Sequence, residues 1–271
     1  MKIGLMQGRL SPINGGKIQS FPWKNWLKEI EISKNLSFKF LEWTLDYPNF
    51  RLNPIFNKKI SKKNQGININ SITCDFFMQK PFFKSKRNKD LISDFNFFLK
   101  KIKNSQIKIL VIPLVDNSSI KNKKIENKVI SFFLNYKDWL KKNNKKIAFE
   151  SDYNPKKLKK FIENFPSQQF GINYDLGNSS ALNFNLNEEF KYYHNRIINI
   201  HIKDRIINGN TTRLGAGNAN FKKFIKNYIK YKLNTNLILQ TARSSNQNHI
   251  LEIIKNRIFL INKFKEFGHH P

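Results

Sequence analysis

Eight short apolar runs, separated by intervals long enough for a helix, constrain the fold of this chain more than any other feature of its sequence. The segments between them show helical spacing, and Phe95, Phe98, Leu99 and Ile102 recur at i, i+3, i+4 and i+7. Strands that alternate with helices form βαβ units around a parallel sheet. The eight runs span residues 2–7, 39–45, 68–74, 108–114, 146–151, 171–176, 197–203 and 236–242.

Two parallel architectures fit such a pattern, a closed barrel and an open doubly wound sheet. The open sheet normally carries a Gly-rich phosphate loop after its first strand, whereas residues 7–12 here read Gln-Gly-Arg-Leu-Ser-Pro. Eight βα units in 271 residues match a (β/α)₈ TIM barrel. We therefore predict an α/β protein with one domain, a TIM barrel over residues 1–271.

Two further helices are expected on the barrel surface. Phe221, Phe224, Ile225 and Tyr228 repeat the helical spacing. The buried stripe of the last helix is predicted to consist of Ile250, Ile253, Ile254, Ile258 and Ile261.

Four of the strand-like runs end in polar side chains, namely Glu150, Asp175, His201 and Gln240. In a TIM barrel the carboxyl ends of all strands lie on one rim, which is where active sites form. Taken singly, each residue has a structural explanation: a carboxylate paired with lysine, a helix cap, a core histidine or a buried amide. Four together are better explained by a cage of oxygen and nitrogen atoms for a divalent cation, with Mn²⁺, Mg²⁺ or Co²⁺ favoured over Zn²⁺.

Further candidates for catalysis and substrate binding flank this set. Arginine and lysine on the rim suit a phosphate or carboxylate group. Trp43 is either a platform for a sugar ring or a structural tryptophan, and Phe76, Phe77, Phe82 and Phe83 either roof a pocket or belong to the core. The predicted substrate-binding residues are Gln7, Arg9, Glu42, Trp43, Asn178, Arg205 and Arg243, and Lys203 and Asp204 lie beside them in the sequence.

The charge is extreme, with 49 Lys and Arg against 19 Asp and Glu and a formal net charge of +30. The lysines are spread over nearly every expected helix and form no single stripe, so we predict a solvated surface rather than a specific nucleic-acid site. The single Cys74 excludes an internal disulfide and a cysteine-based zinc site. No run reaches the roughly 20 apolar residues of a membrane span, and a cytoplasmic location is expected.

Several short motifs are spread over nearly the whole chain, at residues 3–11, 19–23 and 41–43, Glu150, and residues 175–178, 201–205, 214–217 and 239–243. Together they resemble the sugar phosphate isomerase/epimerase family of xylose isomerase-like TIM barrels, which are related to endonuclease IV. The resemblance implies a divalent-metal enzyme acting on a sugar substrate, with Glu150, Asp175, His201 and Gln240 as metal ligands and a homodimer as one possible assembly.

The chain departs from that family at two positions. Epimerases of the family usually carry Glu where this chain has Gln240, and an amide cannot take up a proton. Many relatives have His where this chain has Asn178. We therefore expect Glu150 to be the single base, with proton transfer completed by a metal-bound water or by Lys203, a role that Asp204 or Glu42 could take instead.

The leading hypothesis is an isomerase or epimerase that abstracts a proton next to a carbonyl and passes through an enediolate. A dehydratase or lyase begins with the same step. Two hypotheses from different classes are an apurinic-site endonuclease and a catalytically inactive sugar-binding barrel. The five histidines of the chain are too few for a three-metal nuclease. The hypothesis of an inactive barrel stays possible, because Gln240 replaces a catalytic carboxylate.

Overall fold

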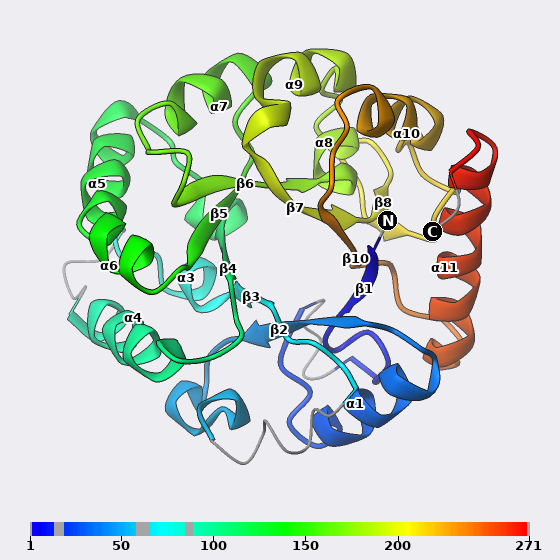
Figure 1. Cartoon of the computed structure of the whole chain (residues 1–271), viewed down its shortest axis with the longest axis horizontal. Coiled ribbons are helices and arrows are strands. Elements are labelled where there is room, and N and C mark those ends of the chain that lie inside the picture. Colours follow the sequence, from blue (N-terminus) through cyan, green and yellow to red (C-terminus); the bar gives the residue numbers. More distant parts are fainter. Residues whose placement is uncertain (1, 14–18, 58–65, 85–88, 270–271) are drawn as a thin grey trace.

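The strands close into a barrel in a computed structural model that describes residues 2–13, 19–57, 66–84 and 89–269. All neighbouring strands run parallel, in the order β1-β10-β7-β6-β5-β4-β3-β2, and Figure 1 shows β1 closing the ring against β10. This confirms the predicted TIM barrel. The barrel strands are β1 (Lys2–Met6), β2 (Phe40–Leu45), β3 (Ser71–Cys74), β4 (Ile109–Leu114), β5 (Lys146–Ser151), β6 (Phe170–Asp175), β7 (Ile197–Ile202) and β10 (Asn236–Leu239).

Helices form the outer layer around the barrel (Figure 1). A short antiparallel pair, β8 (Asp204–Arg205) and β9 (Thr211–Thr212), follows β7 on the rim. The α-helices are α1 (Trp26–Asn35), α3 (Phe76–Gln79), α4 (Lys89–Ile102), α5 (Lys123–Leu134), α6 (Lys137–Lys142), α7 (Pro155–Ile162), α8 (Leu176–Ala181), α9 (Leu186–Tyr193), α10 (Phe221–Lys230) and α11 (His249–Lys265).

Asparagine starts many of these helices. The side-chain oxygens of Asn122, Asn154, Asn185, Asn220 and Asn248 each accept a backbone N–H from the first turn of α5, α7, α9, α10 and α11. Such a cap satisfies one of the N–H groups that has no partner within the helix. The abundant asparagine therefore fixes where the outer helices begin.

Side chains along each strand point alternately into the barrel and outward, into the layer between the barrel and the helices. Trp43 points outward, where its ring packs against Trp26 of α1 and Phe21. Its neighbour Glu42 points into the barrel and contacts His201 of β7. A strand turns successive side chains to opposite faces, so polar residues line the barrel while aromatic residues fill the layer beneath the helices.

The four phenylalanines after β3 belong to that aromatic layer. Phe76, Phe77, Phe82 and Phe83 are all buried. The ring of Phe82 stacks on Phe132 of α5 with a centroid separation of 4.2 Å. These residues therefore belong to the core and do not roof a pocket.

The predicted stripe of α11 is wrong. Ile253 is buried, but Ile250 and Ile258 are 38% and 51% exposed. The buried line runs instead through His249, Glu252, Ile253, Asn256, Leu260 and Phe264. Two of these are polar residues with partners on the loop after β9: Glu252 pairs with Arg213, and Asn256 accepts the backbone N–H of Leu214. The spacing of apolar residues could not predict this face, because polar residues of the helix are buried there by pairing with another loop.

Across the part of the chain that the structure describes, none of the helices has the length and apolar character needed to cross a membrane.

Candidate active site on the C-terminal rim

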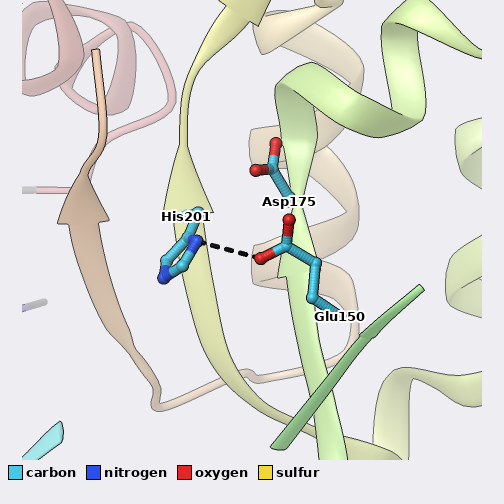
Figure 2. A group of neighbouring side chains, drawn as sticks. All are labelled: Glu150, Asp175 and His201. Atoms are coloured by element: carbon cyan, nitrogen blue, oxygen red, sulfur yellow. Dashed lines mark ion pairs between the residues drawn. The ribbon is translucent and has the colours of Figure 1, made fainter. Parts of the chain in front are cut away.

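Glu150, Asp175 and His201 converge at the carboxyl ends of β5, β6 and β7. One ligand atom from each lies within 4.8 Å of those of the other two, and all three residues are buried. Figure 2 shows the Glu150 carboxylate facing the imidazole of His201, with Asp175 above them on the next strand. Because these strands are adjacent in the barrel, three side chains that are far apart in the sequence share one small space.

Two asparagine amides fix the orientation of the Glu150 carboxylate. Asn173 donates to Oε2 over 2.8 Å and Asn178 donates to Oε1 over 2.7 Å. Burial on its own would raise the pKa of Glu150. The hydrogen bond and charge of His201 and the charge of Lys203 outweigh that effect and hold the pKa below its usual value. Glu150 is therefore ionised and aimed in one direction.

His201 lies between two carboxylates. Its Nε2 is 2.6 Å from Glu42 Oε1, and its Nδ1 is 3.3 Å from Glu150 Oε2. Burial opposes a charged imidazole, but the negative charge of Glu42 and the two carboxylate contacts raise the pKa of His201 to about 10. The Nδ1 atom faces the space shared with Glu150 and Asp175, and Glu42 fixes the ring through the opposite nitrogen.

Glu42 anchors a polar network inside the barrel. It accepts hydrogen bonds from Thr73 Oγ1 at 2.6 Å and from Asn199 Nδ2 at 2.8 Å, and Asn199 also donates to Asn173. Burial would raise the pKa of Glu42, yet the charge of His201 and the hydrogen bonds from His201 and Thr73 lower it. The carboxylate predicted to bind substrate is thus fully buried, and it contacts His201 from below the rim.

Lys203 bridges two of the residues predicted to bind metal. Its Nζ is 2.7 Å from Asp175 Oδ2 and donates to Gln240 Oε1 over 3.0 Å. The lysine stem packs against Gly177, where an added Cβ would lie 2.7 Å from Lys203 Cγ. This close approach requires glycine at the start of α8. The ammonium is therefore held in place by packing as well as by charge.

The residues fit a divalent cation with three protein ligands. Two carboxylates and an imidazole nitrogen converge in a buried space, which is a donor set suited to Mn²⁺, Co²⁺ or Zn²⁺. The fourth predicted ligand, Gln240, accepts a hydrogen bond from Lys203 through its amide oxygen, and Lys203 also pairs with Asp175. A site of three ligands leaves coordination positions for substrate oxygens, as catalytic sites do.

The loop after β1 is held over the rim by buried charges. Glu29 of α1 accepts the backbone N–H groups of Gly8 and Leu10, and Gly8 has a φ of +89° that favours glycine. Arg243 donates to the carbonyl oxygens of Gly8 and Ser11. The structure thus places Arg243 where it ties the first and last loops of the barrel together.

Arg9 and Gln7 follow β1 and are buried. Arg9 donates to Gln19 over 2.6 Å, and burial followed by the charge of Arg243 lowers the pKa of Arg9 to about 9. The opposing charges of Asp75 and Asp175 also act on it, which places the guanidinium near the rim carboxylates. The Gln7 side chain accepts the backbone N–H of Thr44.

Three other predicted residues make contacts within the protein. The Trp43 ring has no exposed surface and donates to Asn53, so it is enclosed in the aromatic layer. Arg205 donates to Gly209 and to Asn178, through which it reaches Glu150. Asp204 accepts the backbone N–H groups of residues 215, 217 and 219, and so it shapes the loop that follows β9.

Three residues of the site, Asn173, Asn199 and Asp75, were not predicted from the sequence. Asn173 and Asn199 each lie two residues before a predicted ligand, so the alternation of a strand places them on the same inner side. That spacing is a signal that could have found them. Asp75 directly follows β3, in a position equivalent to that of the predicted ligands, but the phenylalanines that come next make the segment read as purely apolar.

Comparison with solved structures assigns the fold. No protein-family model matches the sequence, and no curated protein matches it either. The chain is similar to a xylose isomerase domain protein from Planctomyces limnophilus, with a TM-score of 0.77 and 12% identity over 98% of both chains. It is also similar to the IolI protein with a bound zinc atom (TM-score 0.74, 14% identity, 97% of this chain and 99% of that one).

A third similar structure is D-psicose 3-epimerase with D-tagatose from Clostridium cellulolyticum H10. The TM-score is 0.73 at 10% identity, covering 97% of this chain and 99% of the epimerase. At such low identity these matches establish the fold. The chain shares the TIM-barrel fold of these proteins over nearly its whole length.

Proposed function

We propose that this protein is a divalent-metal-dependent isomerase or epimerase that acts on a sugar or sugar derivative. The observation that carries the proposal is the convergence of Glu150, Asp175 and His201 on the C-terminal rim, with the Glu150 carboxylate oriented by two amides. In TIM barrels this rim is where catalysis takes place. The solved structures that share the fold include one of an epimerase with a sugar.

Glu150 is the proposed base. It takes a proton from the carbon next to the substrate carbonyl, and the electron pair moves onto the carbonyl oxygen to give an enediolate. Returning a proton to the neighbouring carbon gives an isomer, whereas returning it to the other face of the same carbon gives an epimer. Because Asn173 and Asn178 fix both oxygens, little reorientation is needed when the proton is transferred.

A metal ion held by Glu150, Asp175 and His201 would polarise the carbonyl and stabilise negative charge on its oxygen. The Lys203 ammonium, which is fixed between Asp175 and Gln240, would also stabilise negative charge on that oxygen. It is also positioned to donate a proton to a substrate oxygen. The rim thus combines one base with a cationic group that favours the enediolate.

The positive charge of the chain favours an anionic substrate. A net charge of +30 raises the local concentration of phosphorylated or acidic sugars around the protein. We therefore include sugar phosphates in the substrate class. A dehydratase would use the same first step, and product analysis separates the two reactions.

The test is deuterium wash-in from D₂O into a panel of ketoses and ketose phosphates, measured by NMR in the presence of Mn²⁺. The wild-type protein is expected to exchange the proton next to the carbonyl of at least one member and to form its isomer or epimer. Glu150→Gln is expected to lose exchange by at least a hundredfold, because general-base catalysis contributes about 10²- to 10⁴-fold. Exchange at the wild-type rate in that variant would refute the assignment of the base.

The matched control is Glu163→Gln, which removes a carboxylate from the exposed end of α7 and should leave exchange unchanged. Because Glu150 is also a proposed metal ligand, the Mn²⁺ content of each variant is measured alongside. Rates compared at saturating Mn²⁺ separate loss of the base from loss of the ion.

A further inference from the structure

A third carboxyl group near the rim, Asp75, is not part of the proposed metal site. Asp75 directly follows β3, whose alternate residues face the barrel interior. Two residues earlier, the Thr73 hydroxyl donates to Glu42 inside the barrel. Asp75 lies one residue beyond the end of β3, at the N-cap of α3 (φ −61°, ψ −20°), and the charges of Glu150 and His201 act on it.

The strand register places Asp75 level with Glu150. Thr73 pairs with Val111 of β4, and Val111 pairs with Ala148 of β5. Asp75 and Glu150 each lie two residues beyond these paired positions, with Pro113 of β4 between them. Neighbouring strands are about 4.8 Å apart, so the two backbones are roughly 10 Å apart. Two carboxyl groups at the same height thus flank the barrel mouth.

Electrostatic neighbours place Asp75 in the same mouth. The charges of Asp46, Glu150, His201 and Arg9 all act on its carboxyl group. Burial, followed by the negative charges of Asp46 and Glu150, raises the pKa of Asp75 well above its usual value. A raised pKa favours the protonated carboxylic acid, which is the form that can donate a proton.

Asp75 also differs from the rim carboxylates around it in its contacts. On the rim, Glu150 accepts hydrogen bonds from amides and Asp175 pairs with Lys203, and below the rim Glu42 pairs with His201. Asp75 is 4% exposed, and its Oδ2 is buried with no hydrogen-bond partner among the residues that the structure describes. A buried polar atom without a partner is destabilising, and a bound ligand would give this atom a partner.

We propose that Asp75 is the second proton carrier of this site and that the reaction is therefore an epimerisation. The inference rests on the function proposed above and deepens it. Glu150 removes the proton from one face of the carbon, and the electron pair moves to the carbonyl oxygen. As the carbonyl reforms, the Asp75 O–H delivers its proton to the other face of that carbon. Glu150 ends protonated and Asp75 ionised, and exchange with water restores both. Asp75 thus fills the role that the Gln240 amide cannot.

The test separates exchange from inversion. In D₂O with Mn²⁺ and a responsive ketose, NMR follows deuterium in the recovered substrate and the appearance of epimer. The wild-type protein is expected to show both. Asp75→Asn is expected to retain wash-in through Glu150 while epimer formation falls at least a hundredfold. The control Asp116→Asn, at an exposed acid after β4, should change neither.

Epimer formation at the wild-type rate in Asp75→Asn would overturn the proposal, and so would equal loss of wash-in and epimer in a variant that still folds and binds Mn²⁺. If the asparagine variant does not fold, Asp75→Ala gives the second test, because added formate should restore epimer formation if the missing group is a proton carrier. Absence of wash-in by the wild-type protein with every ketose would instead refute the proposed function itself.

Discussion

Replacing Lys203 with methionine tests whether its ammonium occupies part of the cation site. The substitution keeps the apolar stem that packs on Gly177 but removes the charge 2.7 Å from Asp175 Oδ2. The side chains of Asp175 and Lys203 are only 2% and 12% exposed. Removing one partner of a buried pair costs about 3–5 kcal/mol. Because the lysine reaches solvent, we expect a loss of about 3 kcal/mol without metal.

For a chain of this size, about 3 kcal/mol corresponds to a fall in Tm of roughly 6–12 °C. Mn²⁺ should reverse much of that fall, because the ion supplies the positive charge that Asp175 has lost. Without competition from the ammonium, we expect Mn²⁺ to bind Lys203→Met at least about tenfold more tightly than the wild type, a difference of about 1.4 kcal/mol. The Mn²⁺-dependent rise in Tm should therefore be larger in the variant.

The assay is thermal unfolding followed by circular dichroism over a series of Mn²⁺ concentrations. Lys160→Met, at an exposed position on α7, is the control and should match the wild type in both Tm and metal response. An equal Mn²⁺-dependent rise in wild type and Lys203→Met would refute the reasoning, because the ammonium would then not compete with the ion.

Three other substitutions examine the surroundings of the same site. Gln240→Glu adds a carboxylate beside Lys203 and the proposed metal ligands, so calorimetry should show tighter Mn²⁺ binding; unchanged affinity would mean that this position lies outside the reach of the ion. Glu42→Gln removes the charge 2.6 Å from His201 Nε2 and should lower the free energy of unfolding by about 3 kcal/mol; urea denaturation measures this, and a change below about 0.5 kcal/mol would contradict the pairing. Gly177→Ala places a Cβ 2.7 Å from Lys203 Cγ and should destabilise the fold by about 1–3 kcal/mol in the same assay; a neutral result would show that the lysine stem can move aside.

The sequence predicts the barrel and the position of its rim because both follow from periodicity. Eight apolar runs with helix-sized intervals leave few topologies, and polar residues at strand ends in a barrel must share one rim. The three-residue cluster of Glu150, Asp175 and His201 follows from that rule. By the same rule of alternation, Glu42 and Trp43 point to opposite sides of β2, which explains why the carboxylate reaches His201 while the indole packs beneath α1.

What the sequence could not supply are the contacts between distant segments. The hydrogen bond from Lys203 to Gln240 joins two loops, and no spacing rule indicates that an ammonium takes the amide oxygen. The buried face of α11 depends on Arg213 and Leu214, which lie on another loop. In both cases the two contacting segments are distant in the sequence, and closure of the barrel brings them together.

The central claim is that Glu150, Asp175 and His201 form one metal centre on the rim. Anomalous diffraction from crystals soaked in Mn²⁺ tests it most directly. We predict a single strong peak within about 2.0–2.3 Å of one atom from each of the three residues, beyond bonding distance of Gln240. A peak elsewhere, or none at this position under saturating Mn²⁺, would contradict the claim.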